Sequence, residues 1–393
     1  MPSSLQESQA RRARDRRRRR GKRGRTLALA AAATLLAGCG LAIPLTGGGG
    51  EPRVPQPAAA PVAPELPASQ LVGQRLIAGF EGTRVPGGMR RMIAGGRVAG
   101  VILFEQNVDG KSPTARLVAS LQKIPRPDGL EIPLAVMVDQ EGGLVERVPG
   151  PPSASAEDMG ERGATFARRQ GEATARNLLG VGVNVDLAPV VDVPRSRSAI
   201  ATEGRAFGPG PAPVIDVGVD GFAAGLRAAG VAATAKHFPG LGAAQVNTDE
   251  ATQQIDLSRA RLRAIDEAPF KAFAESGGEL IMLSLATYTA FSNRPAALSP
   301  KIVTGELRGR LGFEGVSITD SLDAAAAIGF ADRDRVAVAA AKAGSDLLLY
   351  GDWRTAREVS RPLRHKLASG ELDRADFEAA VERVLELRRG LAG

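Results

Sequence analysis

Short apolar runs recur along the chain from residue 69 onward, and longer amphipathic stretches separate them. Each run is continuously apolar rather than alternating, which is typical of parallel β-strands buried on both faces. The stretches between the runs resemble helices. Residues 258–278, for example, end on the pair Gly277–Gly278, which is a helix-stop signal. The eight runs are residues 76–80, 98–104, 132–138, 181–189, 230–235, 279–285, 315–319 and 345–350.

Eight strands alternating with helices predict an α/β fold, namely a single closed (β/α)8 barrel of the TIM type. An open, doubly wound sheet is the alternative. No Gly-rich dinucleotide-binding fingerprint follows the first run, and this disfavours the open sheet. We therefore expect residues 68–393 to form one barrel domain.

The first 38 residues follow a different pattern. An Arg-rich segment, Arg11 to Arg25, precedes thirteen uncharged residues, 26–38. These are too few for a membrane-spanning helix, which needs about 20 residues, but they suit the apolar region of a signal peptide. The sequence LAGC, residues 36–39, resembles a bacterial lipobox, in which the cysteine is lipidated. We expect residues 1–38 to be a lipoprotein signal peptide, and Cys39 to anchor an exported protein to the outer face of the cell membrane. A plain secretory signal with an incidental cysteine is the alternative.

Residues 39–67 are rich in Gly, Pro and Ala and lack periodicity, which predicts a flexible tether. The formal net charge of the chain is +8. Residues 1–25 contain eleven Lys and Arg against Glu7 and Asp15, so the leader accounts for the whole positive excess. We therefore expect no nucleic-acid partner, because the remainder of the chain lacks an evident basic stripe.

Polar residues follow several of the predicted strands directly. They are Asp186 and Asp192 around the end of the fourth, Asp139, Gln140 and Glu141 after the third, Lys236 and His237 after the fifth, and Asp320 after the seventh. In such barrels the carboxyl ends of the strands carry the active site. With Arg147 and Arg205 in nearby loops, these groups form a set suited to charge-assisted hydrogen bonds with hydroxyls. No metal-ligand spacing, phosphate-binding loop or G-x-S-x-G elbow occurs, so we expect no metal and no cofactor.

The motifs at these positions resemble those of family 3 glycoside hydrolases, specifically the single-barrel β-N-acetylhexosaminidases. The resemblance covers roughly residues 66–390 and is carried by VDQEGGLVERVPG, NVDLAPVVDV, GRAFGPGP, KHFPG, SLATY and SITDSLD. It implies retaining hydrolysis with Asp320 as the nucleophile. It also implies substrate binding by Asp139, Arg147, Arg205, Lys236 and His237. Many β-glucosidases of this family carry a second α/β domain, whereas this chain ends after the barrel, which favours the hexosaminidase type.

The chain departs from the family in the loop that begins at KHFPG. The family loop continues to a histidine that donates the proton and an aspartate two residues before it. Here Asp249 and Asn247 occupy those positions. The second histidine of the chain, His365, is expected on a solvated helix face. Asp249, or its neighbour Glu250, is therefore the candidate general acid/base, with Asn247 as a group that could orient it. To act near neutral pH, Asp249 needs a raised pKa. The alternative is that Asp249 is only a turn or capping residue.

The sequence thus predicts a retaining, exo-acting β-glycosidase. By resemblance it is a β-N-acetylhexosaminidase that removes terminal β-linked N-acetylglucosamine from cell-wall or chitin-type oligosaccharides. The alternatives are a β-glucosidase and a catalytically weak or inactive sugar-binding lipoprotein. Asp323 is a rival nucleophile within SITDSLD, and we expect it in the first turn of the helix that follows, where negative charge is favourable.

Overall fold

The computed structural model describes residues 66–392. The predicted signal peptide, the lipidation site Cys39 and nearly all of the predicted tether lie outside the described residues. Within them, the first element is helix α2, Ala68–Gly73. No helix in this part of the chain is both long enough and apolar enough to cross a membrane.

Eight parallel strands form one sheet in the order β10–β1–β2–β3–β4–β5–β7–β9. The sheet closes on itself because β9 and β10 are joined by a parallel bridge between Ile318 and Leu347. The strands are β1 Leu76–Ala78, β2 Gly100–Ile102, β3 Ala135–Val138, β4 Val185–Asp186, β5 Ala232–Phe238, β7 Leu280–Leu283, β9 Val316–Thr319 and β10 Leu348–Tyr350. Each lies within or overlaps one of the eight predicted runs. The prediction of a single (β/α)8 barrel is confirmed.

Both faces of the barrel strands are buried, which explains why the runs are continuously apolar. Successive side chains along a strand point to opposite faces. One set packs outward against the helices, including Leu76, Ala78, Val136 and Ile281. The other set fills the barrel, including Ile77, Met137, Leu187, Met282 and Leu349. Val384 and Leu391, in and just after the last helix, join this inner set, so the C-terminal helix covers one end of the barrel.

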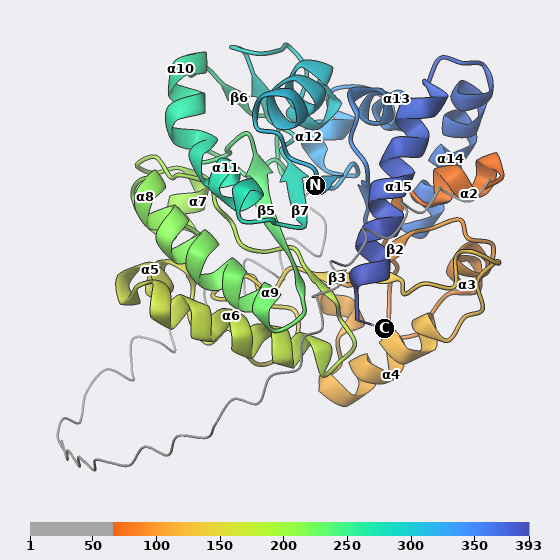
Figure 1. The fold of residues 1–393 in the computed structure, drawn as a ribbon, viewed down its shortest axis with the longest axis horizontal. Helices are drawn as coiled ribbons and strands as arrows, with labels where there is room; N and C mark the ends of the chain where they lie inside the picture. The colour runs from red at the N-terminus through yellow and green to blue at the C-terminus, as the bar shows by residue number, and fades with distance from the viewer. Residues whose placement is uncertain (1–65, 393) are drawn as a thin grey trace, which may run out of the picture. The chain divides into compact units, whose positions relative to one another are not determined.

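Helices surround the strands (Figure 1). The longer ones are α3 Gly87–Ala94, α4 Lys111–Gln122, α5 Ala156–Arg162, α6 Ala164–Leu179, η2 Val214–Ala223, α11 Ala268–Glu275, η5 Lys301–Arg310, α13 Arg333–Ala343, α14 Trp353–Ala368 and α15 Arg374–Gly390. The shorter ones are η1 Glu105–Asn107, α7 Ala199–Thr202, α8 Pro211–Pro213, α9 Ala224–Ala228, α10 Arg259–Arg261, η3 Leu262–Asp266, η4 Ala296–Leu298 and α12 Ala325–Ile328.

The helix predicted over residues 258–278 is divided into α10, η3 and α11. The Ser258 hydroxyl caps the start by accepting the Arg261 amide. Pro269 stands in the first turn of α11 and has no amide hydrogen, so it begins a new helix rather than continuing the previous one. The predicted stop is confirmed, since α11 ends just before Gly277, whose φ is 75°.

Two short strands were not predicted. β6, Gln254–Ile255, pairs in parallel with β8, Thr287–Tyr288. The Tyr288 hydroxyl also donates a hydrogen bond of 2.9 Å to the carbonyl of Gly240. This small sheet therefore fixes the long segment that leaves β5, which is the segment that carries Asp249.

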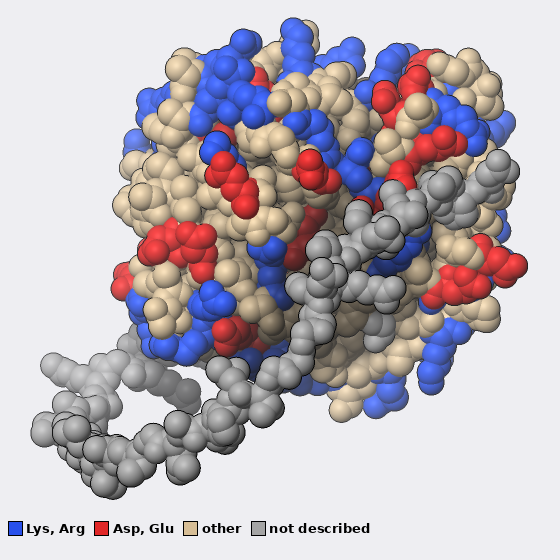
Figure 2. Space-filling model, viewed as in Figure 1, with Lys and Arg blue, Asp and Glu red and all other residues tan. Residues whose placement is uncertain are grey.

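The surface of the barrel mixes charges of both signs. On the face shown in Figure 2, Lys and Arg are interspersed with Asp and Glu over the described residues. This face therefore does not present the continuous basic patch that is typical of nucleic-acid-binding surfaces.

Candidate active site

The predicted site residues meet at the carboxyl ends of the strands. Asp139 follows β3, and Asp320 follows β9. Lys236 and His237 are among the last three residues of β5. Arg205 reaches them from the loop after β4, where an ion pair joins it to Glu141. This is the end of the barrel at which such folds hold their chemistry.

A buried ion network forms the centre of this site. The ammonium of Lys236 lies 2.7 Å from a carboxylate oxygen of Asp139 and 2.7 Å from one of Glu141. Arg205 binds Glu141 with two parallel hydrogen bonds of 2.8 and 2.9 Å, and a third Arg205 nitrogen lies 3.1 Å from Glu203. Glu141 belonged to the polar set expected from the sequence, but its ion pairs with Lys236 and Arg205 were not predicted. Its partners stand far away in the chain, so their pairing becomes evident only in the fold.

The network keeps its members charged. Burial alone would raise the pKa of Asp139, but Lys236 and Arg147 hold that pKa below its usual range. Burial also acts against ionised Glu141, whose pKa Arg205 and Lys236 nevertheless keep well below the usual range. Burial alone would lower the pKa of Lys236, and the two carboxylates raise it instead. The result is a fixed set of charged donors and acceptors, as recognition of sugar hydroxyls requires.

Arg147 stands at the edge of this network, 3.9 Å from the second oxygen of Asp139. The side chain of Gln140 holds the intervening loop by accepting the backbone amides of Arg147 and Val148, each at 2.9 Å. Gly142 turns the loop at a φ of 89°, and a Cβ there would meet the carbonyl oxygen of Ala154 at 2.3 Å. The turn therefore requires glycine.

His237 is held by Asp192. One carboxylate oxygen of Asp192 lies 2.7 Å from Nδ1 of the imidazole. The other oxygen accepts the backbone amides of His237 and Leu241 at 3.1 and 2.6 Å. Asp192 is fully buried, so it fixes both the ring and the start of the loop. This contact leaves Nε2 as the imidazole nitrogen that Asp192 does not engage.

Asp320 is partly exposed at the end of β9. Its backbone amide donates to the carbonyl of Leu283 at 3.0 Å, and one of its carboxylate oxygens accepts the Ser321 amide at 2.8 Å. The sequence predicted that Asp323 lies in the first turn of the next helix, and this prediction is wrong. Asp323 precedes α12 and accepts the amide of Gly351 at 2.8 Å, so it ties the loop after β9 to the end of β10.

Asp249 lies in a turn that packs against the loop after Asp320. The side chain of Asn247 accepts the Asp249 backbone amide at 3.1 Å, so it fixes the turn rather than the carboxyl group. The amides of Ala325 and Ala326 donate to the carbonyls of Asp249 and Thr248 at 3.4 and 3.2 Å. Turn chemistry is thus present, and it brings Asp249 to the candidate site.

The environment of Asp249 raises the pKa of its carboxyl group above the usual range. Asp249 as a whole is exposed to solvent. The protein around its carboxyl group nevertheless displaces water from it, and this desolvation raises the pKa of the group to about 6. The negative charge of Asp320 adds to the increase. The charge of His237 acts in the opposite direction. A carboxyl group with this pKa is partly protonated near neutral pH, as a proton donor must be.

Asp186 lies beneath the ion network and is fully buried. One oxygen accepts the Gln140 amide at 3.0 Å, and the other has no hydrogen-bond partner among the described residues. Burial raises its pKa well above the usual range; Lys236 opposes the increase, whereas Asp139 and Glu141 contribute to it. Burial at this position therefore favours the protonated form of Asp186.

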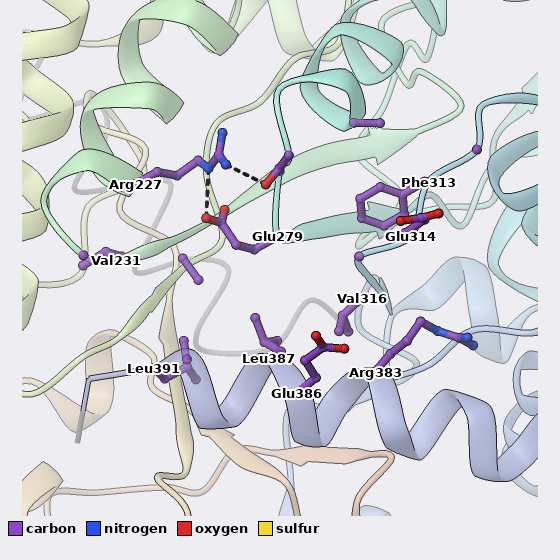
Figure 3. A pocket seen from close by; sticks show the side chains of 18 residues that line it. Arg227, Val231, Glu279, Phe313, Glu314, Val316, Arg383, Glu386, Leu387 and Leu391 are labelled. Carbon is purple, nitrogen blue, oxygen red and sulfur yellow. Dashed lines mark hydrogen bonds and ion pairs between the residues drawn. The ribbon is translucent and has the colours of Figure 1, made fainter. Parts of the chain in front are cut away.

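Two other features lie away from this site. His365 is exposed on α14, as predicted. A cavity of about 590 Å³ opens at the opposite end of the barrel, at the starts of β5, β7 and β9 and along α15 (Figure 3). Its Arg227 is bound to Glu279 at 2.9 Å. Catalytic groups of barrels lie at the other end. Within residues 66–392 no group of three or more His, Cys, Asp or Glu is arranged to hold a metal ion.

Comparison with known proteins identifies the family. The model of the glycosyl hydrolase family 3 N-terminal domain matches residues 72–387. The chain therefore belongs to glycosyl hydrolase family 3, and it is a glycoside hydrolase by family and fold. The resemblance drawn from the sequence motifs is confirmed.

Individual relatives agree with this assignment. An uncharacterised secreted glycosyl hydrolase of Arthroderma benhamiae is 35% identical over 85% of this chain and 97% of its own length. Among solved structures, a family 3 β-N-acetylglucosaminidase from Paenibacillus sp. has a TM-score of 0.78 and 30% identity over 82% of this chain; the match spans 63% of that protein. A β-N-acetylhexosaminidase from Beutenbergia cavernae has a TM-score of 0.76 and 30% identity, with 82% of this chain and 99% of that one covered.

Proposed function

We propose that this protein is a retaining, exo-acting β-glycosidase with Asp320 as the nucleophile and Asp249 as the general acid/base. One observation carries the proposal. A largely buried network of ion pairs, suited to hold sugar hydroxyls, stands at the same end of the barrel as two carboxyl groups. One of these, Asp249, has a pKa of about 6, and the charge of the other, Asp320, contributes to it.

The proposed reaction proceeds in two steps, formation and hydrolysis of a covalent glycosyl-enzyme. First, the Asp320 carboxylate attacks the anomeric carbon while protonated Asp249 gives its proton to the glycosidic oxygen. The bond between that carbon and oxygen breaks, and the aglycone leaves as an alcohol. Second, ionised Asp249 takes a proton from water, whose oxygen attacks the anomeric carbon and releases Asp320. Two inversions retain the β-configuration. The sugar hydroxyls are held throughout by the set expected from the sequence, with Glu141 added because it pairs with two of its members: Asp139, Glu141, Arg147, Arg205, Lys236 and His237.

We propose a terminal β-linked N-acetylglucosamine residue as the glycon, in cell-wall or chitin-type oligosaccharides. The support is the similarity to proteins described as a β-N-acetylglucosaminidase and a β-N-acetylhexosaminidase. Export is supported by the similarity to a secreted glycosyl hydrolase. Anchoring through a lipid at Cys39, after cleavage of residues 1–38, extends this proposal, with residues 39–67 as the tether to the barrel domain that begins at residue 68.

The test is a panel of nitrophenyl β-glycosides, with the anomeric configuration of the first-formed product followed by NMR. We expect the N-acetylglucosaminide to be hydrolysed fastest, with retention. Faster hydrolysis of the glucoside would identify a β-glucosidase. Tight binding of N-acetylglucosamine without turnover, even of the dinitrophenyl glycoside, would leave only a sugar-binding lipoprotein.

A further inference from the structure

The most exposed large apolar side chains of the described residues all belong to segments that follow strands at one end of the barrel. Among residues 66–392, these are Leu144 (54% exposed), Val246 (39%), Ile328 (47%) and Phe330 (40%). Leu144 follows β3, Val246 follows β5, and the other two follow β9. These are the strand ends that carry the candidate catalytic groups. Exposed large apolar side chains near such groups are candidates for a binding surface.

Three of them belong to the two segments that meet at the turn of Asp249. The amide of Ala325, at the start of α12, donates to the carbonyl of Asp249. Beyond the helix, a Cβ on Gly329 would lie 3.1 Å from a methyl carbon of Thr252. The helix α12 with its following residues therefore packs along the turn that holds Asp249. Val246, Ile328 and Phe330 are called the α12 patch below.

Ile328 lies on the solvent-exposed face of helix α12. Ala326 and Ala327 are buried, whereas Ala325 and Ile328 are exposed. Positions three apart share one face of a helix. Since the amide of Ala325 reaches Asp249, this exposed face begins next to the candidate acid/base.

The segment beside α12 is held from two directions. The Gln253 side chain accepts the amides of Gln245 and Val246 at 3.2 and 3.4 Å. The carbonyl of Gln253 accepts the amide of Thr287, the first residue of β8, at 2.9 Å. The patch is thus built on a fixed loop, as a binding surface should be.

We propose that the α12 patch is the subsite for the leaving group and that it binds the apolar face of a ring-shaped aglycone. The inference rests on the proposed function. The charged network holds the glycon, and Asp249 must reach the glycosidic oxygen. The group on the other side of that oxygen then extends over the residues beside Asp249, which are those of the patch. An aromatic ring or the C–H face of a sugar ring buries apolar area against Ile328 and Phe330, which favours binding.

Binding of non-hydrolysable ligands tests this proposal without turnover. Methyl and phenyl 1-thio-β-N-acetylglucosaminides differ only in the aglycone, and calorimetry with the full chain gives both affinities. We expect the phenyl compound to bind about tenfold more tightly, since burial of one ring face contributes about that factor. In Phe330→Ser and Ile328→Ser this ratio should fall toward one, while the affinity for the methyl compound stays unchanged. Leu144→Ser is the matched control, because it removes an even more exposed apolar group from another loop, and it should keep the ratio.

The outcomes separate the two proposals. Equal affinities of the parent for both compounds, or a tenfold ratio that survives in the double variant Ile328→Ser/Phe330→Ser, would overturn the subsite alone. A loss of the ratio in Leu144→Ser as large as in Phe330→Ser would also contradict it. If neither compound binds to the parent chain, the proposed glycosidase function is wrong and the subsite with it.

Discussion

At the scale of single residues, the proposed function gives Asp320 and Asp249 separate tasks, and variants should separate them. Asp320→Ala removes the group that forms the covalent bond, so turnover of every aryl glycoside should fall by at least about 10³-fold. A fluorinated slow substrate should label the parent chain at Asp320, as peptide mass spectrometry would show. Label on Asp323 would contradict the assignment, and the bond from Asp323 to the Gly351 amide argues for a structural role there.

Asp249→Ala should act only where a proton is needed. Substrates with poor leaving groups should lose about 10²- to 10⁴-fold in rate, the usual contribution of general acid catalysis. Dinitrophenyl glycosides, whose leaving group needs no proton, should still form the covalent intermediate, and added azide should speed its breakdown. If the rate with poor leaving groups is unchanged, Asp249 is only a turn residue, and Glu250→Ala becomes the next variant to measure.

The raised pKa of Asp249 also fixes the direction of the pH profile. The acid must be protonated in the first step, and its pKa in the folded protein is about 6. The protonated fraction is complete well below that pH and is lost as the pH rises through it. The rate with a poor leaving group should therefore fall on the alkaline side of pH 6, and dinitrophenyl glycosides should lack this loss in the first step. An optimum above pH 8 with both substrate types would contradict the role.

At the scale of elements, the small sheet β6–β8 supports the catalytic loop through Tyr288. Its buried hydroxyl binds the carbonyl of Gly240. Tyr288→Phe keeps the ring but leaves that carbonyl without this donor, so the free energy of unfolding should fall by about 1 kcal/mol. The rate with poor leaving groups should fall more than the rate with dinitrophenyl glycosides, because the loop carries Asp249, the proposed acid. An equal fall for both substrates would indicate general destabilisation instead, and thermal unfolding would measure it.

The elements also differ in how well the sequence predicts them. The eight barrel strands are evident because burial on both faces leaves continuous apolar runs. The convergence of Asp139, Lys236 and Asp320 follows from their places after strands. By contrast, β6 and β8 have two residues each, too few for a pattern. The role of Glu141 depends on ion pairs with Lys236 and Arg205, which the fold brings to it from other parts of the chain. No local sequence pattern predicts such pairs.

At the scale of the whole molecule, the two proposals assign glycon and aglycone recognition to different kinds of surface. The glycon side is a buried network in which each carboxylate is matched to a cation. The aglycone side is an exposed apolar patch on a fixed loop. The first arrangement is directional and discriminates between sugars, because a missing hydroxyl leaves charged groups unmatched. The second is non-directional and tolerates variety in the leaving group. This division suits an exo-acting enzyme that removes one kind of sugar from several kinds of chain.

The attachment of the molecule to a membrane is a separate property that one variant can test. If Cys39 carries the lipid, Cys39→Ser should move the protein from the membrane fraction to the soluble fraction, since its hydrophobic anchor is then missing. Hydrolysis of soluble aryl glycosides should be unchanged, because the groups proposed for catalysis belong to the barrel. The basic segment before residue 26 could hold an unprocessed chain on an anionic surface, so fractions should be washed with high salt, which screens that attraction. A Cys39→Ser protein that stays membrane-bound after the wash would contradict lipidation and favour a plain secretory signal.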